Sequence, residues 1–494
     1  MLNDVFILEL SQVRSVRTIN KLLRATLICA VMLLGACSTT RPWTNQPITP
    51  TSPMPVTSIT GPAVLASAPS QPPSIVAAVT LSGGGARAAA FGLGVLQELK
   101  ATQFELQGRP TSLLDEVGLI SGVSGGSVLA TYYAAFGDEV FTQFENDFLF
   151  VNFQSGLVAD VVSPVGLYRL SSPWYGRSNA LAKHLDTVFR GTTFGELRAR
   201  QRRPRLLVTA TDLSTGLPFE FTPEQFALIC SDLDSVPLSF AVAASSSVPV
   251  LLSPVTVRNY AGSCPQTDQM LEAASAEQNL SAHVLRFIAE SYRNAEERPY
   301  IHLVDGGLVD NLGVRSLLDH TVASNSLDAS FRGVPPGSIH KIVLISVNSE
   351  RVLGDTLDAS DHVPSIGQVL DAMVYGAGSR LTKETTAMVN DTTRRLSEEL
   401  SSTRGKLGSP FASDAEIYVI NVSLQDVADT PLRKALLQVP TAFTILPTQV
   451  RQLEAAGRRA LSESPEYQRL RGSLVTGTYA AAVDVNPLVA PKSH

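Results

Sequence analysis

A serine flanked by glycines is the strongest candidate for chemistry in this chain. Residues 118–130 read Gly-Leu-Ile-Ser-Gly-Val-Ser-Gly-Gly-Ser-Val-Leu-Ala, so that Ser124 stands in a Gly-x-Ser-x-Gly motif. The apolar residues before the motif favour a strand, and the run from Ser127 to Ala135 favours a helix. Strand, sharp turn and helix in this order are what a nucleophile elbow needs. A flexible strand-to-helix turn is the alternative that the motif alone leaves open.

A second glycine-rich stretch follows the first apolar run of the ordered sequence. Residues 75–81 form a continuous apolar run, which is typical of a strand buried on both faces. Gly83, Gly84 and Gly85 come next, ahead of an Ala-rich segment at 88–99 that favours a helix. Three glycines between a strand and a helix allow backbone N–H groups to converge on one anion.

Three kinds of anion site compete for this loop. A dinucleotide site also needs a second strand that ends in an acidic residue, whereas the corresponding stretch 100–112 is polar and irregular. A P-loop is excluded because no Lys-Ser/Thr pair follows the glycines. An oxyanion hole fits best, because the elbow serine comes 39 residues after Gly85, on what should be the adjacent strand.

The serine also needs a base. The seven histidines are scattered; His302 lies in a strand-like run and His320 ends a helical one, so neither is a strong third member of a triad. Asp305 stands out instead, because it follows the strand-like run 300–304 and precedes Gly306 and Gly307. Open α/β sheets place their sites at such carboxyl strand ends. An ordinary Asp-Gly turn is the alternative.

Together, these three stretches resemble the patatin-like phospholipases, which combine a glycine-rich oxyanion loop, a Gly-x-Ser-x-Gly elbow and an Asp-Gly-Gly/Ala motif in this order. The stretch 209–216 resembles the family's strand and turn after the elbow helix, and 241–249 resembles its Ala/Ser-rich helix ending at proline. The resemblance covers roughly residues 75–320. One departure is Ala88, where the family usually has glycine; an alanine is acceptable there if the position is already helical.

The resemblance implies a role for each matching residue. Ser124 is the expected nucleophile and Asp305 its base, in a dyad without histidine that forms an acyl-enzyme. The expected oxyanion donors are Gly83, Gly84 and Gly85. The expected supporting residues are Arg87, which would hold the loop or face lipid phosphate, and Gly122, Gly125, Gly126, Gly306 and Gly307. No metal and no cofactor are implied.

Physical chemistry sets a condition on such a dyad. An ordinary aspartate, with a pKa of ~3.9, is a weak base toward a serine hydroxyl. The pair therefore needs a desolvated contact, and the oxyanion hole must supply much of the stabilisation.

The N-terminus predicts export. A basic stretch ends at Arg24, and the uncharged run 25–36 is long enough for a signal-peptide core but too short to span a bilayer. The sequence Leu-Gly-Ala-Cys at 34–37 resembles the lipobox of bacterial lipoproteins, which implies cleavage before Cys37 and lipid on that cysteine. Ser38 resembles the pattern of lipoproteins sent to the outer membrane. An uncleaved anchor and a simple secretory signal are the alternatives.

The next stretch, up to residue 74, is rich in Pro, Ser and Thr and predicts an extended tether that holds a folded body off a membrane. Cys230 and Cys264 are the only cysteines left in the mature chain, and the sequence leaves open whether they form a disulfide. No cysteine–histidine cluster suggests a metal site.

We expect an α/β fold: a three-layer sandwich with a central, mostly parallel sheet. The expected divisions are the lipoprotein signal peptide at 1–36, the tether at 37–74, a patatin-like catalytic domain at 75–322 and a C-terminal α/β extension at 323–494 that completes the sheet. Strands are expected at 341–347 and 416–422, a long amphipathic segment from 366 toward 400, and a charged surface helix at 449–470. The amphipathic stripe favours core packing, with a lid or membrane contact as the alternative.

The expected function is lipid acyl hydrolysis of phospholipase A or lysophospholipase type, with a lipid substrate and a bacterial envelope location, lipid-anchored at the outer membrane. The net charge of −6 gives no basic excess, so nucleic acid is not expected as a partner. A non-lipid esterase or thioesterase and a catalytically silent envelope scaffold are the alternatives. The head group, acyl position and oligomeric state stay open.

Overall fold

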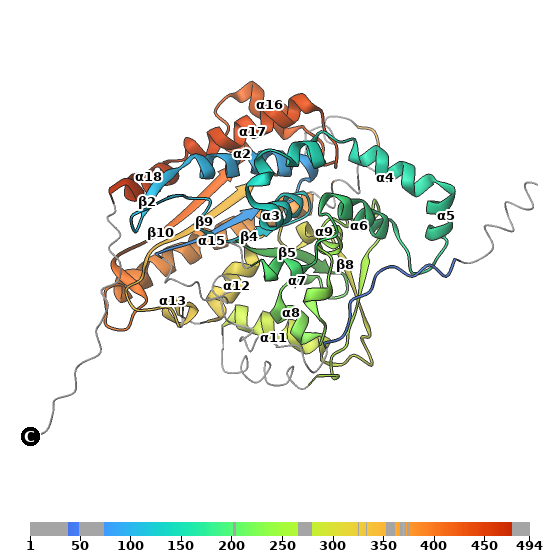
Figure 1. Ribbon diagram of the computed structural model, residues 1–494, viewed down its shortest axis with the longest axis horizontal. Coiled ribbons are helices and arrows are strands. Elements are labelled where there is room, and N and C mark those ends of the chain that lie inside the picture. Colours follow the sequence, from blue (N-terminus) through green and yellow to red (C-terminus); the bar gives the residue numbers. More distant parts are fainter. Residues whose placement is uncertain are drawn as a thin grey trace, which may run out of the picture.

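An eight-stranded sheet with helices on both faces organises the chain (Figure 1). The computed structural model describes residues 38–48, 74–200, 204–264, 279–324, 326–331, 333–351, 361–365, 369, 372 and 376–476. The strand order is β10-β9-β1-β4-β5-β8-β7, with β6 also paired to β5. The predicted α/β sandwich with a mostly parallel sheet is confirmed.

The strands divide into a parallel part and an antiparallel part. The parallel strands are β1 (Ile75–Leu81), β4 (Val117–Gly122), β5 (Arg205–Asp212), β9 (Ile339–Asn348) and β10 (Phe411–Ser423). Antiparallel pairing adds β6 (Leu217–Glu220), β8 (Tyr300–Val304) and β7 (Val255–Arg258). A separate hairpin consists of β2 (Gln103–Leu106) and β3 (Arg109–Ser112).

Helices connect and cover these strands. In the first half of the chain they are α2 (Gly85–Ala101), α3 (Gly125–Phe136), α4 (Phe153–Val162), α5 (Pro164–Leu170), α6 (Arg177–Val188), α7 (Phe194–Ala199), α8 (Pro223–Leu228) and α9 (Leu238–Ser245). In the second half they are α11 (Leu280–Arg293), α12 (Arg315–Ala323), α13 (Leu327–Ser330), α15 (Ala377–Thr403), α16 (Thr430–Leu437), α17 (Pro447–Ser462) and α18 (Pro465–Thr476).

The elements that carry the motifs form where the sequence predicts them. The apolar run 75–81 is β1, and every one of its residues is buried, as expected for a central strand. The serine motif joins β4 to α3, and the run 300–304 is β8. The two later strands, β9 and β10, also form, and β9 pairs directly with β1. The predicted C-terminal extension therefore completes the same sheet that carries the motifs.

The direction of β8 differs from the sequence-based interpretation. We expected Asp305 at the carboxyl edge of parallel strands, but β8 pairs antiparallel with β5, Thr211 opposite Val304. β5 extends beyond its parallel partner β4, whose pairing ends with Gly122 opposite Val208. β8 therefore runs back along the extension of β5 and ends close to the carboxyl end of β4.

The predicted surface helix at 449–470 is wrong in two respects. The chain forms two helices, α17 and α18, with a break before Pro465. One face of α17 is buried against α2, and the two backbones approach closely: a Cβ on Gly94 would lie 2.0 Å from the Glu454 carbonyl oxygen, and one on Gly457 would lie 2.1 Å from that of Phe91. Only glycine fits at such crossings.

The long amphipathic segment is only partly described. Of the stripe positions that predicted it, Ile366, Leu370, Met373 and Val374 lie outside the described residues. Its later part is α15, a helix of 27 residues that contacts β10, α12 and α13. In the described part of the chain, no helix is both long enough and apolar enough to span a membrane.

The predicted tether begins as a docked segment, because residues 38–48 pack on the folded body. Asn45 is fully buried; its amide group donates to the Arg258 carbonyl oxygen (2.9 Å) and accepts from the Arg258 N–H (2.7 Å). The Trp43 ring packs edge-on against Phe240, with centroids 4.6 Å apart. The prediction of an extended tether from residue 37 is therefore wrong for residues 38–48, which pack against the body instead of holding it off. Cys37 and the signal-peptide residues lie outside the described residues.

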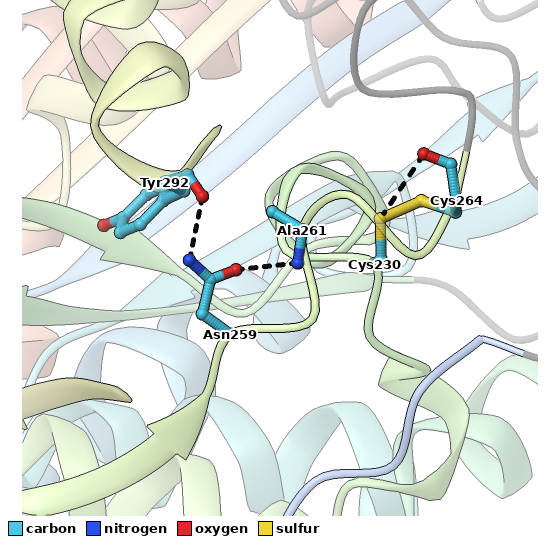
Figure 2. The surroundings of a disulfide bond; sticks show 5 residues. All are labelled: Cys230, Asn259, Ala261, Cys264 and Tyr292. Carbon is cyan, nitrogen blue, oxygen red and sulfur yellow. Dashed lines mark hydrogen bonds between the residues drawn. A yellow bond between two sulfur atoms is a disulfide. The ribbon is translucent and has the colours of Figure 1, made fainter. Parts of the chain in front are cut away.

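The structure joins Cys230 and Cys264, the pair whose state the sequence left open, in a disulfide (Figure 2). Close by, the Asn259 side chain accepts from the Ala261 N–H (3.0 Å) and donates to the Tyr292 carbonyl oxygen (2.8 Å). The disulfide links the segment after β7 to Cys230, shortly after the end of α8. The Asn259 amide links the same segment to Tyr292 on α11.

Removal of the disulfide is expected to destabilise the fold without stopping catalysis. The two cysteines are 34 positions apart, and closing such a loop in the unfolded chain is worth about 3–4 kcal/mol. Cys230→Ala/Cys264→Ala should therefore lower the thermal midpoint, and dithiothreitol should shift the wild type toward the variant. A midpoint equal to that of the wild type would mean that the thiols are reduced in the native protein.

Candidate functional site

Ser124 lies at the turn between β4 and α3 in a backbone conformation that is costly for a residue with a side chain. Its φ is 50° and its ψ −122°. Such strain concentrates at functional turns. A Cβ on Gly122 would lie 2.6 Å from the Ser127 Cα, and one on Gly126 would lie 2.4 Å from the Leu81 carbonyl oxygen. The glycines around the serine are thus required for strand and helix to close around it.

The end of α9 positions the backbones of both Ser124 and Asp305. The Ser124 N–H donates to the Ser245 hydroxyl (2.9 Å), which donates to the Thr209 carbonyl oxygen on β5 (2.7 Å). The Asp305 N–H donates to the Ser247 carbonyl oxygen (3.0 Å). One short, buried segment therefore links two residues that lie far apart in the sequence.

Asp305 is buried and held from several sides. Its Oδ1 accepts a hydrogen bond from the Gly307 N–H (2.8 Å). Asp305 thereby caps the start of the short 3₁₀ turn Gly306–Leu308. Its carbonyl oxygen accepts the Thr211 hydroxyl (2.8 Å). A Cβ on Gly306 would lie 2.2 Å from the Thr209 carbonyl oxygen, so a glycine is required for this turn to reach β5.

Burial raises the pKa of Asp305 to about 6, against smaller lowering effects of the Gly307 N–H and the Ser124 hydroxyl. The hydroxyl thus acts on this carboxylate, yet Oδ2 has no complete hydrogen bond in the described structure. The Ser124 hydroxyl therefore lies close to this carboxylate without completing a hydrogen bond to Oδ2. Catalytic hydrogen bonds are often long before substrate binds. Serine and aspartate are therefore in place for a dyad in which the base is poorly solvated.

The three glycines of the loop after β1 do not have the same role. The Gly83 N–H donates to the Asn311 carbonyl oxygen (3.0 Å), so it is already occupied and the prediction that it is an oxyanion donor is not supported. Gly84 and Gly85 have φ values of 144° and 61°, which favour glycine. Within the described residues, the N–H groups of Gly84, Gly85 and Gly125 have no acceptor.

Arg87 supports this loop rather than facing the cavity as an open cation. Its guanidinium is buried and donates to the Ser349 carbonyl oxygen (2.8 Å), the Val439 carbonyl oxygen and the Thr441 hydroxyl (3.2 Å). Of the two roles that the sequence suggested, support of the loop matches this geometry. The arginine also connects the first turn of α2 to the C-terminal part of the chain.

Arg87→Lys is expected to lower stability by about 2 kcal/mol or more, because a single ammonium cannot make the forked contacts and charged hydrogen bonds are worth that much. The loop should loosen, so the hydrolysis rate should fall as well. Denaturant midpoints and initial rates would measure both effects. Arg198→Lys is the matched control, because Arg198 is exposed; if it costs as much, the effect is not specific to the loop.

Asn311 is a site residue that sequence reasoning missed. Its carbonyl oxygen holds Gly83, and its Oδ1 lies 2.5 Å from where a Cβ on Gly83 would be. Together with Ser245 and Ser247, it positions the site through contacts with distant residues. The only signal in the sequence was the Asp-Asn pair shortly after the Asp-Gly-Gly motif.

These residues surround one cavity. Its lining includes Gly83, Gly84, Arg87, Ser124, Val248, Asp305, Gly307, Leu308, Asn311, Glu350, Arg351, Gly378 and Thr441. No histidine is among them. The structure thus brings together the predicted serine, aspartate and glycine loop, and adds one wall from the start of α15. No group of three potential metal ligands occurs in the described part of the chain.

Residues 79–318 match the family model of the patatin-like phospholipases. No curated protein sequence matches the chain. Solved structures that match include human GIVD cytosolic phospholipase A2, at 12% identity and a TM-score of 0.41 over 81% of this chain and 62% of that one. VipD from Legionella pneumophila matches at 13% identity and a TM-score of 0.28, over 80% of this chain and 66% of that one. The chain thus spans less than two thirds of the length of these neighbours, and the family assignment rests on the domain model.

Proposed function

We propose that this chain cleaves carboxylic esters of lipids through a Ser124–Asp305 dyad. The chain belongs to the patatin-like phospholipase family and is, at family level, a lipid hydrolase. The observation that carries the proposal is the strained Ser124, beside a buried carboxylate and three N–H groups for which the described residues hold no acceptor.

In the first step, the Ser124 hydroxyl attacks the ester carbonyl and its proton passes to Asp305. Burial, which raises the Asp305 pKa to about 6, makes this carboxylate a better base than an ordinary aspartate. Oδ2 accepts no hydrogen bond from the described residues, so it offers an acceptor position for that proton. The loose contact would tighten as the substrate excludes water.

The negative oxygen of the tetrahedral intermediate would bind to the N–H groups of Gly84, Gly85 and Gly125. These groups lie at the N-termini of α2 and α3, where the helix dipole also favours negative charge. The protonated Asp305 then gives its proton to the leaving oxygen, and an acyl-enzyme forms on Ser124. Water releases the fatty acid by the reverse sequence, with Asp305 as base again.

We also propose that the protein works at a bacterial envelope membrane, attached through lipid on Cys37, in the outer membrane. The proposal rests on the Leu-Gly-Ala-Cys sequence and on Ser38 after it. A membrane phospholipid is the substrate class that fits such an attachment.

The test uses the full chain, purified in detergent, with a fluorophosphonate probe and two substrate classes: vesicles of diacyl phospholipids and p-nitrophenyl butyrate. We expect the probe to label the wild type but not Ser124→Ala. Ser246→Ala is the matched control, because the Ser246 hydroxyl is buried, finds no hydrogen-bond partner in the part of the chain that the structure describes, and its loss should leave labelling intact.

The outcomes separate the candidate functions. Release of fatty acid from vesicles supports the lipid hydrolase. Turnover of the short ester alone would identify a non-lipid esterase. A folded wild type with neither labelling nor turnover would mean a catalytically silent protein and would refute the proposal.

A further inference from the structure

Large apolar side chains are exposed together on one side of the molecule. They come from α4, from α5 and from the loop that follows α5, and we call this set the apolar face. Its members are Val158, Val162, Val165, Leu167, Tyr168 and Trp174, each between 45% and 59% exposed. Clusters of exposed large apolar side chains mark sites of protein or membrane interaction.

The helices of this face carry few charges. Between Phe153 and Leu170 only Asp160 and Arg169 are charged, and Asp160 faces Lys183 at 3.7 Å. A helix that is apolar on most sides is normally buried. Figure 1 shows α4 and α5 at the right edge of the molecule, away from the sheet, so the body of the protein leaves much of their surface uncovered.

A second exposed element extends the apolar face toward the cavity. Val250 and Leu251 are 59% and 65% exposed, and Val250 has a φ of 73°, which is strained for a β-branched residue. The Val250 carbonyl oxygen accepts from Arg177 (2.8 Å), so this loop lies beside the start of α6. Val248, two residues earlier, lines the cavity with Ser124. The face therefore reaches from α4 to the candidate active site.

The beginning of the described N-terminal segment, at residues 38–41, contacts this same face. The Ser172 hydroxyl, just after α5, donates to the Thr40 carbonyl oxygen (2.7 Å), and the Arg41 guanidinium lies over the Trp174 ring at 3.3 Å. Ser38, which is buried, directly follows Cys37 in the sequence. Since consecutive Cα atoms are about 3.8 Å apart, lipid on Cys37 would bring the bilayer to this face.

We propose that the apolar face, together with Val250 and Leu251, docks into the lipid bilayer and presents the Ser124 cavity to it. The lipid attachment at Cys37, on which this inference rests, belongs to the proposed function; the docking surface goes beyond it. Arg41, Arg169 and Arg177 lie on or beside the face and form no ion pair within the described residues, so they suit anionic head groups. Tyr168 and Trp174 are residues that favour the membrane interface.

The fluorescence of Trp174 can report this docking. The chain has two tryptophans, Trp43 and Trp174, and only Trp174 lies on the apolar face. In the full chain with Trp43→Phe, reconstituted from detergent into vesicles, brominated acyl chains should quench the Trp174 fluorescence. The lipid attachment keeps the protein on the vesicle in every variant, so the quenching reports the orientation of the body rather than its binding.

Val165→Asp/Leu251→Asp should lower the ratio of docked to undocked protein by about tenfold or more, because buried carboxylates are strongly disfavoured in lipid. An acid at Val165 suits the first turn of α5, and Leu251 lies in a turn, so folding should be kept. Leu280→Asp/Leu407→Asp is the matched control, with two exposed apolar residues elsewhere. Only the first pair should lose quenching and turnover of vesicle phospholipid, whereas both should keep turnover of p-nitrophenyl butyrate.

An unquenched Trp174 on vesicle-bound protein would overturn the proposal. Protection of Trp174 from aqueous iodide that rises with protein concentration, with no lipid quenching, would assign the face to a second copy instead. Failure of the proposed function is distinguishable, because quenching would then persist without any hydrolysis.

Discussion

Asp305→Asn is expected to lower the hydrolysis rate by about 10³-fold, the loss typical of a missing general base. Ser124→Ala should cost about 10⁴-fold or more, and the double variant should be no worse than Ser124→Ala alone, because a nucleophile and its base act as one unit. Initial rates on vesicles and on p-nitrophenyl butyrate measure these effects. If the two losses multiplied instead, Asp305 would act on something other than the serine.

The same carboxylate determines the pH dependence. Its pKa is raised to about 6, and it must be ionised to accept the serine proton. We therefore expect kcat/KM to rise with pH up to about 6 and to level off above it. Asp310→Asn is the matched control: Asp310 is also buried and its pKa is also raised to about 6, but it does not contact the serine. The control should keep the acid limb of the profile.

Stability should respond in the opposite direction. The folded-state pKa of Asp305 lies above the ordinary value of 3.8, so the folded protein binds the proton more tightly than the unfolded chain. Its contribution is favourable below about pH 4 and is lost as the pH rises through 6. Asp305→Asn should therefore stabilise the fold at pH 8, by at most about 3 kcal/mol. A lower thermal midpoint at pH 8 would show instead that the ionised carboxylate makes a stabilising contact.

The sequence was sufficient for the parts of the site that depend on local geometry. An elbow serine needs small residues on both sides and a strand and helix next to it, so its signals lie within a few residues of Ser124. The same holds for the glycine loop after β1. The elbow and the glycine loop both form where the sequence predicts them, because positive φ values and close backbone contacts restrict these positions to glycine and other small residues.

The parts of the site that depend on contacts between residues far apart in the sequence could not be predicted from local residue patterns. Ser245, Ser247 and Asn311 are common residue types whose role arises only when α9 and the turn after β8 meet the elbow. The direction of β8 could not be predicted either, because a strand-like run of five residues does not specify whether its partner strand is parallel or antiparallel. Composition likewise failed for residues 38–48, where Asn45 and Trp43 hold a Pro/Ser/Thr-rich segment on the body.

Gly125→Ala is expected to destabilise the protein by about 3 kcal/mol or more, at the upper end of overpacking costs. A Cβ at this position would lie 2.1 Å from the Gly85 carbonyl oxygen and 2.4 Å from its nitrogen. Both contacts are with backbone, so no side-chain movement can relieve them. The elbow and the oxyanion loop would have to separate, and the loss of even one oxyanion donor costs about 10²–10³-fold in rate.

Gly118→Ala provides the control, because it adds the same methyl group to β4, upstream of the elbow. There the nearest atom to a Cβ is the Ala77 carbonyl oxygen at 3.7 Å, an ordinary contact, so stability should change by less than about 1 kcal/mol. Urea midpoints and rates on both substrates would compare the two variants. Full activity in Gly125→Ala would mean that the two loops have room to move apart, and the oxyanion donors would then have to be sought away from Gly85 and Gly125. A stable but inactive Gly125→Ala would instead separate the two effects, and would assign the interlocked glycines to transition-state stabilisation rather than to folding.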